Sequence, residues 1–172
     1  RCVQAAAQAI APGQGSMRAL LGQIVRFTDK GQILKMSKRE GNFITIKDAI
    51  DKVGLDAIRF MMVSRKSDGG LDFDFDRVIE QSKDNPVFYV QYAYARCHSV
   101  KRHIQEQFPE LSLESKDLMN IDWSPLKQEA FLALIKKLMA WPRYLEQAAQ
   151  SYETQKICGY MGELAALLHG IW

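Results

Sequence analysis

The feature that most restricts the fold of this sequence is a change in its pattern near residue 76. Before that point, glycine, proline, asparagine and aspartate divide the chain into short apolar runs, which is typical of alternating strands and short helices. After it, apolar residues recur at helical spacing almost to the last residue. The sequence therefore predicts a mainly helical protein in two parts: a mixed α/β part over residues 1–75 and an all-helical part over residues 76–172.

The mixed part is expected to hold a β-hairpin followed by two short helices. Apolar residues in 20–27 and 32–36 flank the turn sequence T-D-K-G, a pattern that predicts the hairpin. Residues 47–53 and 55–65 have helical periodicity, and Gly54 between them is expected to end the first helix.

The segment LDFDFD, residues 71–76, allows two interpretations. Asp72, Asp74 and Asp76 match the first acidic positions of an EF-hand loop, but the glycine and the glutamate that such a loop needs further on are missing. We therefore expect no metal site here. The alternation of apolar and acidic residues favours an edge strand that buries Phe73 and Phe75.

In the helical part, prolines and polar runs mark where helices begin and end. Residues 77–107 have helical character, but Pro86 predicts a break or a kink within them. A polar connection over residues 108–123 precedes a helix for which Ser124 provides a capping signal. The final helix is expected over TQKICGYMGELAALLHGIW, at the end of the chain.

Composition excludes several classes of protein. The chain is 47% hydrophobic, with a net charge of +3, which permits a polyanionic partner without requiring one. Cys2, Cys97 and Cys158 form no CxxC pair, so neither a disulfide framework nor a cysteine zinc site is expected, and buried free thiols in a reducing cytosol are the simplest interpretation. No apolar run reaches the length of a membrane span.

The sequence KMSKR, residues 35–39, concentrates positive charge beside Gly41. A loop carrying two ammonium groups and a guanidinium can stabilise a polyphosphate. No Walker A pattern occurs in the chain, and the charge pattern alone favours a solvated turn over a phosphate site.

The helix containing NPVFYVQYAYARCHSVKR is the strongest candidate for nucleic-acid binding. Helical spacing places Tyr89, Tyr92 and Arg96 on one face. Aromatic rings beside cations can stack on unpaired bases and hold phosphates. The residue pattern alone slightly favours packing of these tyrosines over RNA contact. The histidines lack ligand spacing and are expected to be structural: His98, His103 and His169.

Several segments together resemble one enzyme family. KMSKR is similar to the signature loop of class I aminoacyl-tRNA synthetases, and its flanks KMSKREGN, DAIR, LDFD and DNPVFYVQYAYAR resemble bacterial arginyl-tRNA synthetase. The resemblance runs from about residue 20 to the end of the chain and is strongest over residues 35–96.

The resemblance implies a partial Rossmann-type catalytic remnant followed by a DALR-type helical anticodon-binding bundle. It implies that the chain is an inactive fragment of a cytoplasmic, monomeric enzyme that activates arginine with ATP and Mg²⁺ and transfers it to tRNA(Arg), without a tightly bound cofactor. The alternative is a stand-alone helical module for RNA binding or protein interaction that has no catalytic activity.

Residue roles also follow from the resemblance. Lys35 and Lys38 correspond to the catalytic signature lysines, and the ATP contacts would come from the loop residues Lys35, Met36, Ser37, Lys38 and Arg39. The tRNA contacts would come from Tyr89, Tyr92 and Arg96. Glu40 departs from the small residue expected after this loop.

Overall fold

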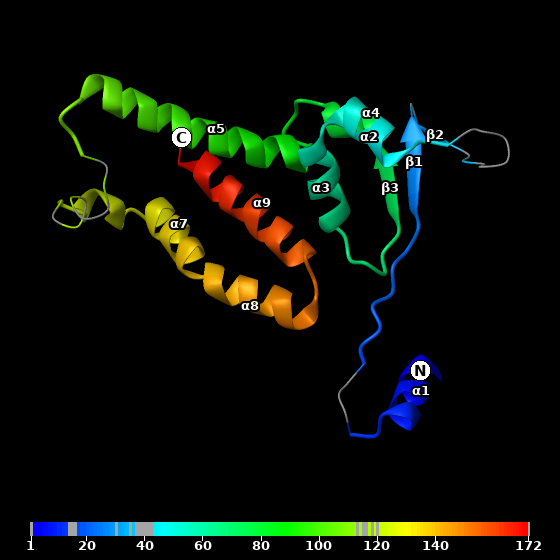
Figure 1. Cartoon of the computed structure of the whole chain (residues 1–172). Helices are drawn as coiled ribbons and strands as arrows, with labels where there is room; N and C mark the ends of the chain where they lie inside the picture. Colours follow the sequence, from blue (N-terminus) through cyan, green and yellow to red (C-terminus); the bar gives the residue numbers. More distant parts are fainter. Residues whose placement is uncertain are drawn as a thin grey trace.

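The structure, a computed structural model, describes residues 2–13, 17–29, 31–34, 36, 43–112, 114, 117, 119 and 121–171. The signature-loop residues Lys35, Ser37, Lys38 and Arg39 lie outside this set. Figure 1 shows a sheet with short helices beside it, a group of long helices, and α1 (Cys2–Ile10), which lies apart from both. The protein is mostly helical with one small sheet, as the sequence predicts.

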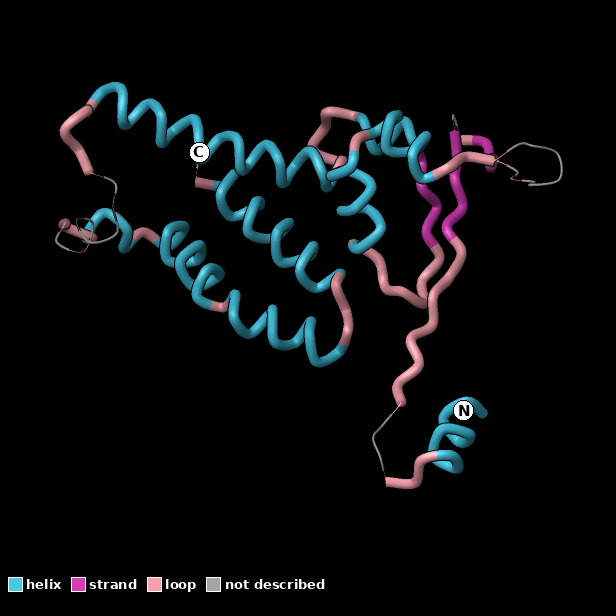
Figure 2. The backbone as a smooth tube through the Cα atoms, in the orientation of Figure 1, coloured by secondary structure: helices cyan, strands magenta, loops and turns pink. Residues whose placement is uncertain are grey.

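The sheet has three strands in the order β2-β1-β3. Strands β1 (Val25–Asp29) and β2 (Gln32–Ile33) are antiparallel, which confirms the predicted hairpin in a shorter form. Strand β3 (Leu71–Asp74) pairs with β1 in parallel. The chain returns from β2 to β3 through α2 (Ile46–Val53) and α3 (Leu55–Val63), as Figure 2 shows.

The alternating segment after residue 70 forms a strand that is shorter than predicted. Asp72 lies opposite Arg26 and accepts hydrogen bonds from its Nε at 2.6 Å and from a terminal nitrogen at 3.1 Å. The strand ends at Asp74, whose carboxylate accepts from the backbone N–H groups of Asp76 and Arg77 and so caps α4 (Phe75–Ile79). These contacts give two of the acidic side chains structural partners.

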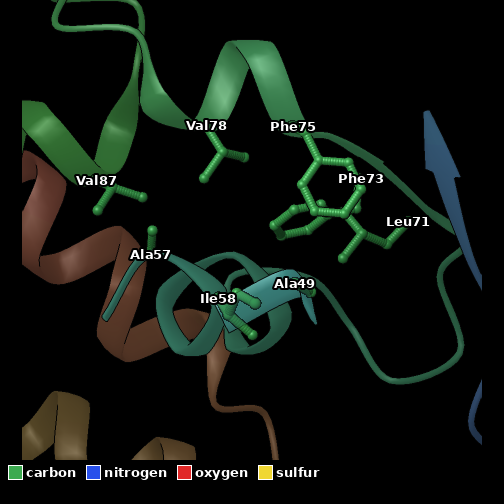
Figure 3. Close-up of a cluster of buried hydrophobic side chains, with 8 residues drawn as sticks. All are labelled: Ala49, Ala57, Ile58, Leu71, Phe73, Phe75, Val78 and Val87. Carbon is green, nitrogen blue, oxygen red and sulfur yellow. The ribbon is translucent and has the colours of Figure 1, made fainter. Parts of the chain in front are cut away.

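Three phenylalanines form the centre of the main core. Phe27, Phe73 and Phe75 have ring centroids 5.3–5.5 Å apart, and Phe73 and Phe75 are fully buried, as predicted. Figure 3 shows that these two rings face Ala49 of α2 and Ile58 of α3. Edge-to-face and offset aromatic contacts of this kind stabilise beyond the area that they bury.

The helical part begins with α5 (Pro86–Gln107) and continues through the short 3₁₀ helix η1 (Ser124–Lys127), α7 (Glu129–Met139), α8 (Trp141–Ser151) and α9 (Gln155–Gly170). Helix α9 lies between α5 and the α7–α8 pair and packs against all three (Figure 1). The predicted break at Pro86 is confirmed, because Pro86 is the first residue of α5.

The predicted capping of an α-helix by Ser124 is wrong. The hydroxyl of Ser124 donates to Asp122 at 2.6 Å and caps no α-helix. Residues 124–127 form the 3₁₀ turn instead, and α7 begins at Glu129 without a side-chain cap. Ser124 thus lies within the 3₁₀ turn and not at the N-cap position of α7, which Gln128 occupies.

Helices α7, α8 and α9 are joined by one lysine, whose side chain is only 11% exposed. The Lys137 ammonium lies 4.3 Å from the ring centroid of Tyr144 and 5.0 Å from that of Tyr160, donates to the Tyr144 hydroxyl at 3.0 Å and pairs with Glu163. Burial disfavours its charge, but the hydrogen bonds to Glu163 and Tyr144 outweigh burial and raise its pKa.

The α8–α9 turn joins the helical part to the sheet part. Glu153 accepts a charged hydrogen bond from Lys156 at 2.7 Å and pairs with Lys66 at 3.4 Å. The hydroxyl of Thr154 donates to the carbonyl of Val63, at the end of α3, at 3.3 Å. Hydrogen bonding, first of all from Lys156, lowers the pKa of Glu153 to about 2.

The cysteine prediction is right for one residue. Cys158 is a buried free thiol whose pKa is raised by burial, whereas Cys2 and Cys97 are exposed. Cys2 is on the isolated α1, and Cys97 is on α5. Among the described residues, no helix combines the length and the apolar character that a membrane crossing requires.

Candidate nucleic-acid interface

Helix α5 is anchored to the sheet part by its cap. Asn85 is 5% exposed, and its side-chain oxygen accepts from the backbone N–H of Val87 at 3.0 Å. Its amide nitrogen donates to the carbonyls of Val78 and Glu80 at 2.8 and 2.7 Å. A fully satisfied buried amide fixes the direction in which α5 leaves the core.

The predicted RNA-binding tyrosines lie on the side of α5 that meets α9. The ring of Tyr89 is 4.6 Å from the imidazole of His169, and that of Tyr92 stacks between Phe88 at 6.0 Å and the same imidazole at 5.4 Å. Tyr89 is half-buried, whereas Tyr92 is 50% exposed. Tyr89 therefore helps to join two helices, and Tyr92 keeps half of its surface in water.

Arg96 follows Tyr92 by one helical turn and is half-buried. The structure thus brings the three predicted tRNA residues to one side of α5, as the helical spacing required. Sequence reasoning missed His169 as their neighbour. Its position near the end of the last helix carries no local signal, because only the packing of α9 on α5 brings it there.

A second aromatic and basic set lies on the other side of α5. Tyr94 is 67% exposed, and its ring centroid is 4.3 Å from that of His98, one turn further on. Lys101 and Arg102 continue this side and are exposed. The sequence contains the signal for this set, namely an aromatic residue and a histidine four positions apart, followed by two cations.

Of the predicted ATP-binding residues, only Met36 lies within the described set. Its side chain is 42% exposed. Strand β2 precedes the loop, and α2 follows it three residues after Phe43. The catalytic roles of Lys35 and Lys38 remain predictions.

Helix α2, which follows the loop, begins with a complete capping box. The Thr45 hydroxyl accepts from the Asp48 N–H at 3.1 Å, while the Asp48 carboxylate accepts from the Thr45 N–H at 2.8 Å. Hydrogen bonding from the Thr45 side chain and backbone lowers the pKa of Asp48. This box fixes where the chain re-enters regular structure after the loop.

The DAIR element is structural in its first residue and solvent-facing in its last. Gly54, with φ of 86°, ends α2 as predicted, and Asp56 lies in the first turn of α3. Arg59 is exposed, and no ion pair joins it to another described residue.

Residues 90–172 match the family described as the DALR anticodon binding domain. They comprise most of α5 and all of the helices after it. The match therefore begins within the helix that carries the predicted tRNA residues, one residue after Tyr89.

The whole chain is similar to arginine–tRNA ligases. It is 46% identical over 170 residues to that of Rhizobium rhizogenes and 48% identical over 170 residues to that of Sinorhizobium medicae, with 99% of this chain aligned in each case. The chain spans 29% of the length of each of these relatives.

Two solved structures of arginyl-tRNA synthetases are also similar to the chain. An arginyl-tRNA synthetase of Campylobacter jejuni matches with a TM-score of 0.73 and 32% identity, over 88% of this chain and 31% of its own. The arginyl-tRNA synthetase of Thermus thermophilus matches with a TM-score of 0.53 and 25% identity, over 77% of this chain and 20% of its own. The resemblance that the sequence motifs suggested is confirmed along almost all of the chain.

Proposed function

We propose that this chain serves arginine–tRNA ligation as the part of the enzyme that holds the anticodon and supplies one loop of the ATP site. The observation that carries the proposal is the continuous similarity to arginine–tRNA ligases over 99% of the chain. The DALR match over residues 90–172 supports tRNA as the partner of the helical part.

In the complete enzyme, ATP and Mg²⁺ would activate arginine, and the arginyl group would then pass to tRNA(Arg) in the cytoplasm. Lys35 and Lys38 would stabilise the charge that develops on the triphosphate when the carboxylate of arginine attacks the α-phosphate and pyrophosphate leaves. Fixed cations aimed at developing charge can each be worth about 3 kcal/mol in such a step. Met36, Ser37 and Arg39 would complete the loop around ATP.

The chain alone is expected to be inactive, because it corresponds to 29% of the length of the ligases that it resembles. The test is arginine-dependent exchange of pyrophosphate into ATP by the purified chain. Exchange above that of a Lys35→Ala, Lys38→Ala double variant would contradict inactivity.

The anticodon role is tested by filter retention of tRNA(Arg). Tyr92→Ala removes a half-exposed ring, and Arg96→Ala removes a cation one turn away. We expect each change to weaken binding, because stacking and phosphate contacts each contribute to affinity for unpaired RNA. Thr154→Ser is the control, because it keeps the hydroxyl and lies in the α8–α9 turn, outside this side of α5. Unchanged retention by both variants would exclude this side of α5 as an RNA surface.

A further inference from the structure

We propose that α5 carries a second RNA contact, on the side away from α9, where Tyr94 and His98 stack on an unpaired base and Lys101 and Arg102 hold the adjoining phosphates. We call these four residues the outer face. The inference rests on the proposed function, since it assumes that tRNA is the partner, and it adds a surface that the tyrosines next to α9 do not provide.

The first observation is the exposure of a large aromatic ring. Tyr94 is 67% exposed, more than Tyr92 at 50%, and no described residue other than His98 has a ring against it. The two rings are 4.3 Å apart and inclined by 52°, so a planar face of Tyr94 remains open to solvent. An exposed ring supported by a second ring is the kind of platform on which a base can stack.

The second observation is the charge of this side. Residues 86–105 of α5 contain no aspartate or glutamate, while Lys101 and Arg102 lie one turn beyond His98. Within the described part of the chain, neither cation is held in an ion pair. Tyr94 and Arg102 lie on the same side of α5. At 1.5 Å per residue, the helix rises about 12 Å between them.

The third observation is the contrast with the opposite side. There, His169 already occupies the faces of Tyr89 and Tyr92 at 4.6 and 5.4 Å. There a base can reach only the exposed half of Tyr92, and a stack over the whole ring would displace the imidazole and loosen the contact between α5 and α9. The Tyr94 ring can accept a base without disturbing the packing of any helix.

These features favour unpaired RNA over a duplex or an acidic protein. A duplex is bound mainly through its backbone and sugars and offers no free base face to Tyr94. An acidic protein would need the cations but not the ring. A change that removes the ring and leaves the cations therefore separates unpaired RNA from the other two kinds of partner.

The experiment measures binding of the full chain to a fluorescein-labelled RNA hairpin with the tRNA(Arg) anticodon stem-loop sequence, by fluorescence anisotropy. The variants are Tyr94→Leu, Tyr94→Phe and Arg102→Gln. Phe43→Leu, which removes a 50% exposed ring on the sheet part, is the matched control. The stem alone, as a blunt duplex, is the second probe, and circular dichroism verifies that each variant keeps its helices.

We expect Tyr94→Leu to raise Kd for the hairpin about tenfold, since a base–aromatic stack contributes about 1–3 kcal/mol. Its Kd for the duplex should not change, and Tyr94→Phe should bind as the unmodified chain does. Arg102→Gln should reduce the slope of log K against log salt by about 0.7, the value for one phosphate contact on a single strand. Phe43→Leu should have no effect.

Three outcomes would overturn the inference. If Tyr94→Leu binds the hairpin like the unmodified chain while Tyr92→Ala binds it weakly, the outer face is not the contact and the proposed function stands. If Tyr94→Leu weakens the hairpin and the duplex equally, the ring is not stacking on a base. If the unmodified chain binds neither the hairpin nor tRNA(Arg), the inference and the proposed function fall together.

Discussion

The imidazole of His169 lies 4.6 Å from the ring of Tyr89, and its Nε2 lies 3.3 Å from the carbonyl oxygen of the same residue. The two residues are 80 positions apart in the chain, so this contact joins the first long helix to the last. A tyrosine that the sequence marks as an RNA ligand is thereby also a packing residue of the bundle.

Replacing His169 by alanine should destabilise the protein. The change removes aromatic contacts to Tyr89 and Tyr92 and a hydrogen bond, so we expect a loss of about 1–2 kcal/mol in the free energy of unfolding. Urea denaturation followed by circular dichroism measures it. His98→Ala, which changes an exposed histidine whose ring lies against that of Tyr94, is the control and should cost under about 0.5 kcal/mol. Equal losses in the two variants would contradict the joining role of His169.

Lys137→Met should also lower the free energy of unfolding. The methionine keeps much of the apolar stem but loses the contacts of the ammonium with two rings, the Tyr144 hydroxyl and Glu163, at an expected cost of about 1–2 kcal/mol. Its neighbour Lys136 is exposed, so Lys136→Met is the matched control and should stay within about 0.5 kcal/mol. Chemical denaturation at neutral pH compares the two. A stable Lys137→Met protein would show that apolar packing alone holds the three helices.

Glu153 in the α8–α9 turn should make the stability of the protein fall at low pH. The pKa of Glu153 is lowered from 4.5 to about 2 in the folded protein. Its contribution is therefore fully present above pH 4.5 and is lost as the pH falls from there towards 2. We expect the thermal midpoint of the unmodified chain to fall more steeply across this window than that of Glu153→Gln.

The control for this comparison is Glu110→Gln, since Glu110 is an exposed carboxylate outside the turn. Its profile should follow that of the unmodified chain. If Glu153→Gln has the same slope as both, the lysine contacts of Glu153 do not persist in solution.

Thr45→Ala should remove the cap of α2. Loss of such a cap costs about 1 kcal/mol, and Thr45→Ser, which keeps the hydroxyl, should restore most of it. Because the Thr45 hydrogen bonds hold the pKa of Asp48 below its ordinary value, we also expect that pKa to rise in the alanine variant. An NMR titration of the Asp48 carboxyl measures this shift. An unchanged pKa would mean that the capping box does not form in solution.

Local signals predicted the positions at which the chain turns. Pro86 is the first residue of α5, a position at which its missing N–H removes no helical hydrogen bond. Gly54 adopts the positive φ that a residue with a side chain avoids. Phe73 and Phe75 were expected inside because apolar and acidic residues alternate around them, although Phe75 is the first residue of a helix and not part of the strand.

Contacts between distant segments could not be predicted in this way. No local pattern specifies that β3 pairs with β1 in parallel, that His169 meets Tyr89, or that Lys137 is enclosed by two tyrosines. Ser124 is a residue type that caps helices, yet it lies in the 3₁₀ turn, and Gln128 occupies the N-cap position of α7. In each case the partner is set by packing, which a single sequence encodes only through the whole fold.

The position of α9 between the other helices has a consequence for how the protein is made. Helix α5 is synthesised 80 residues before the helix that covers Tyr89, an interval of roughly 4–16 s at common rates of translation. The sheet part has its partners within 46 residues, as for Arg26 and Asp72, and can close earlier. During that interval α5 lacks its cover beside a sheet that can already have folded, so a chaperone or a neighbouring nascent chain can reach it.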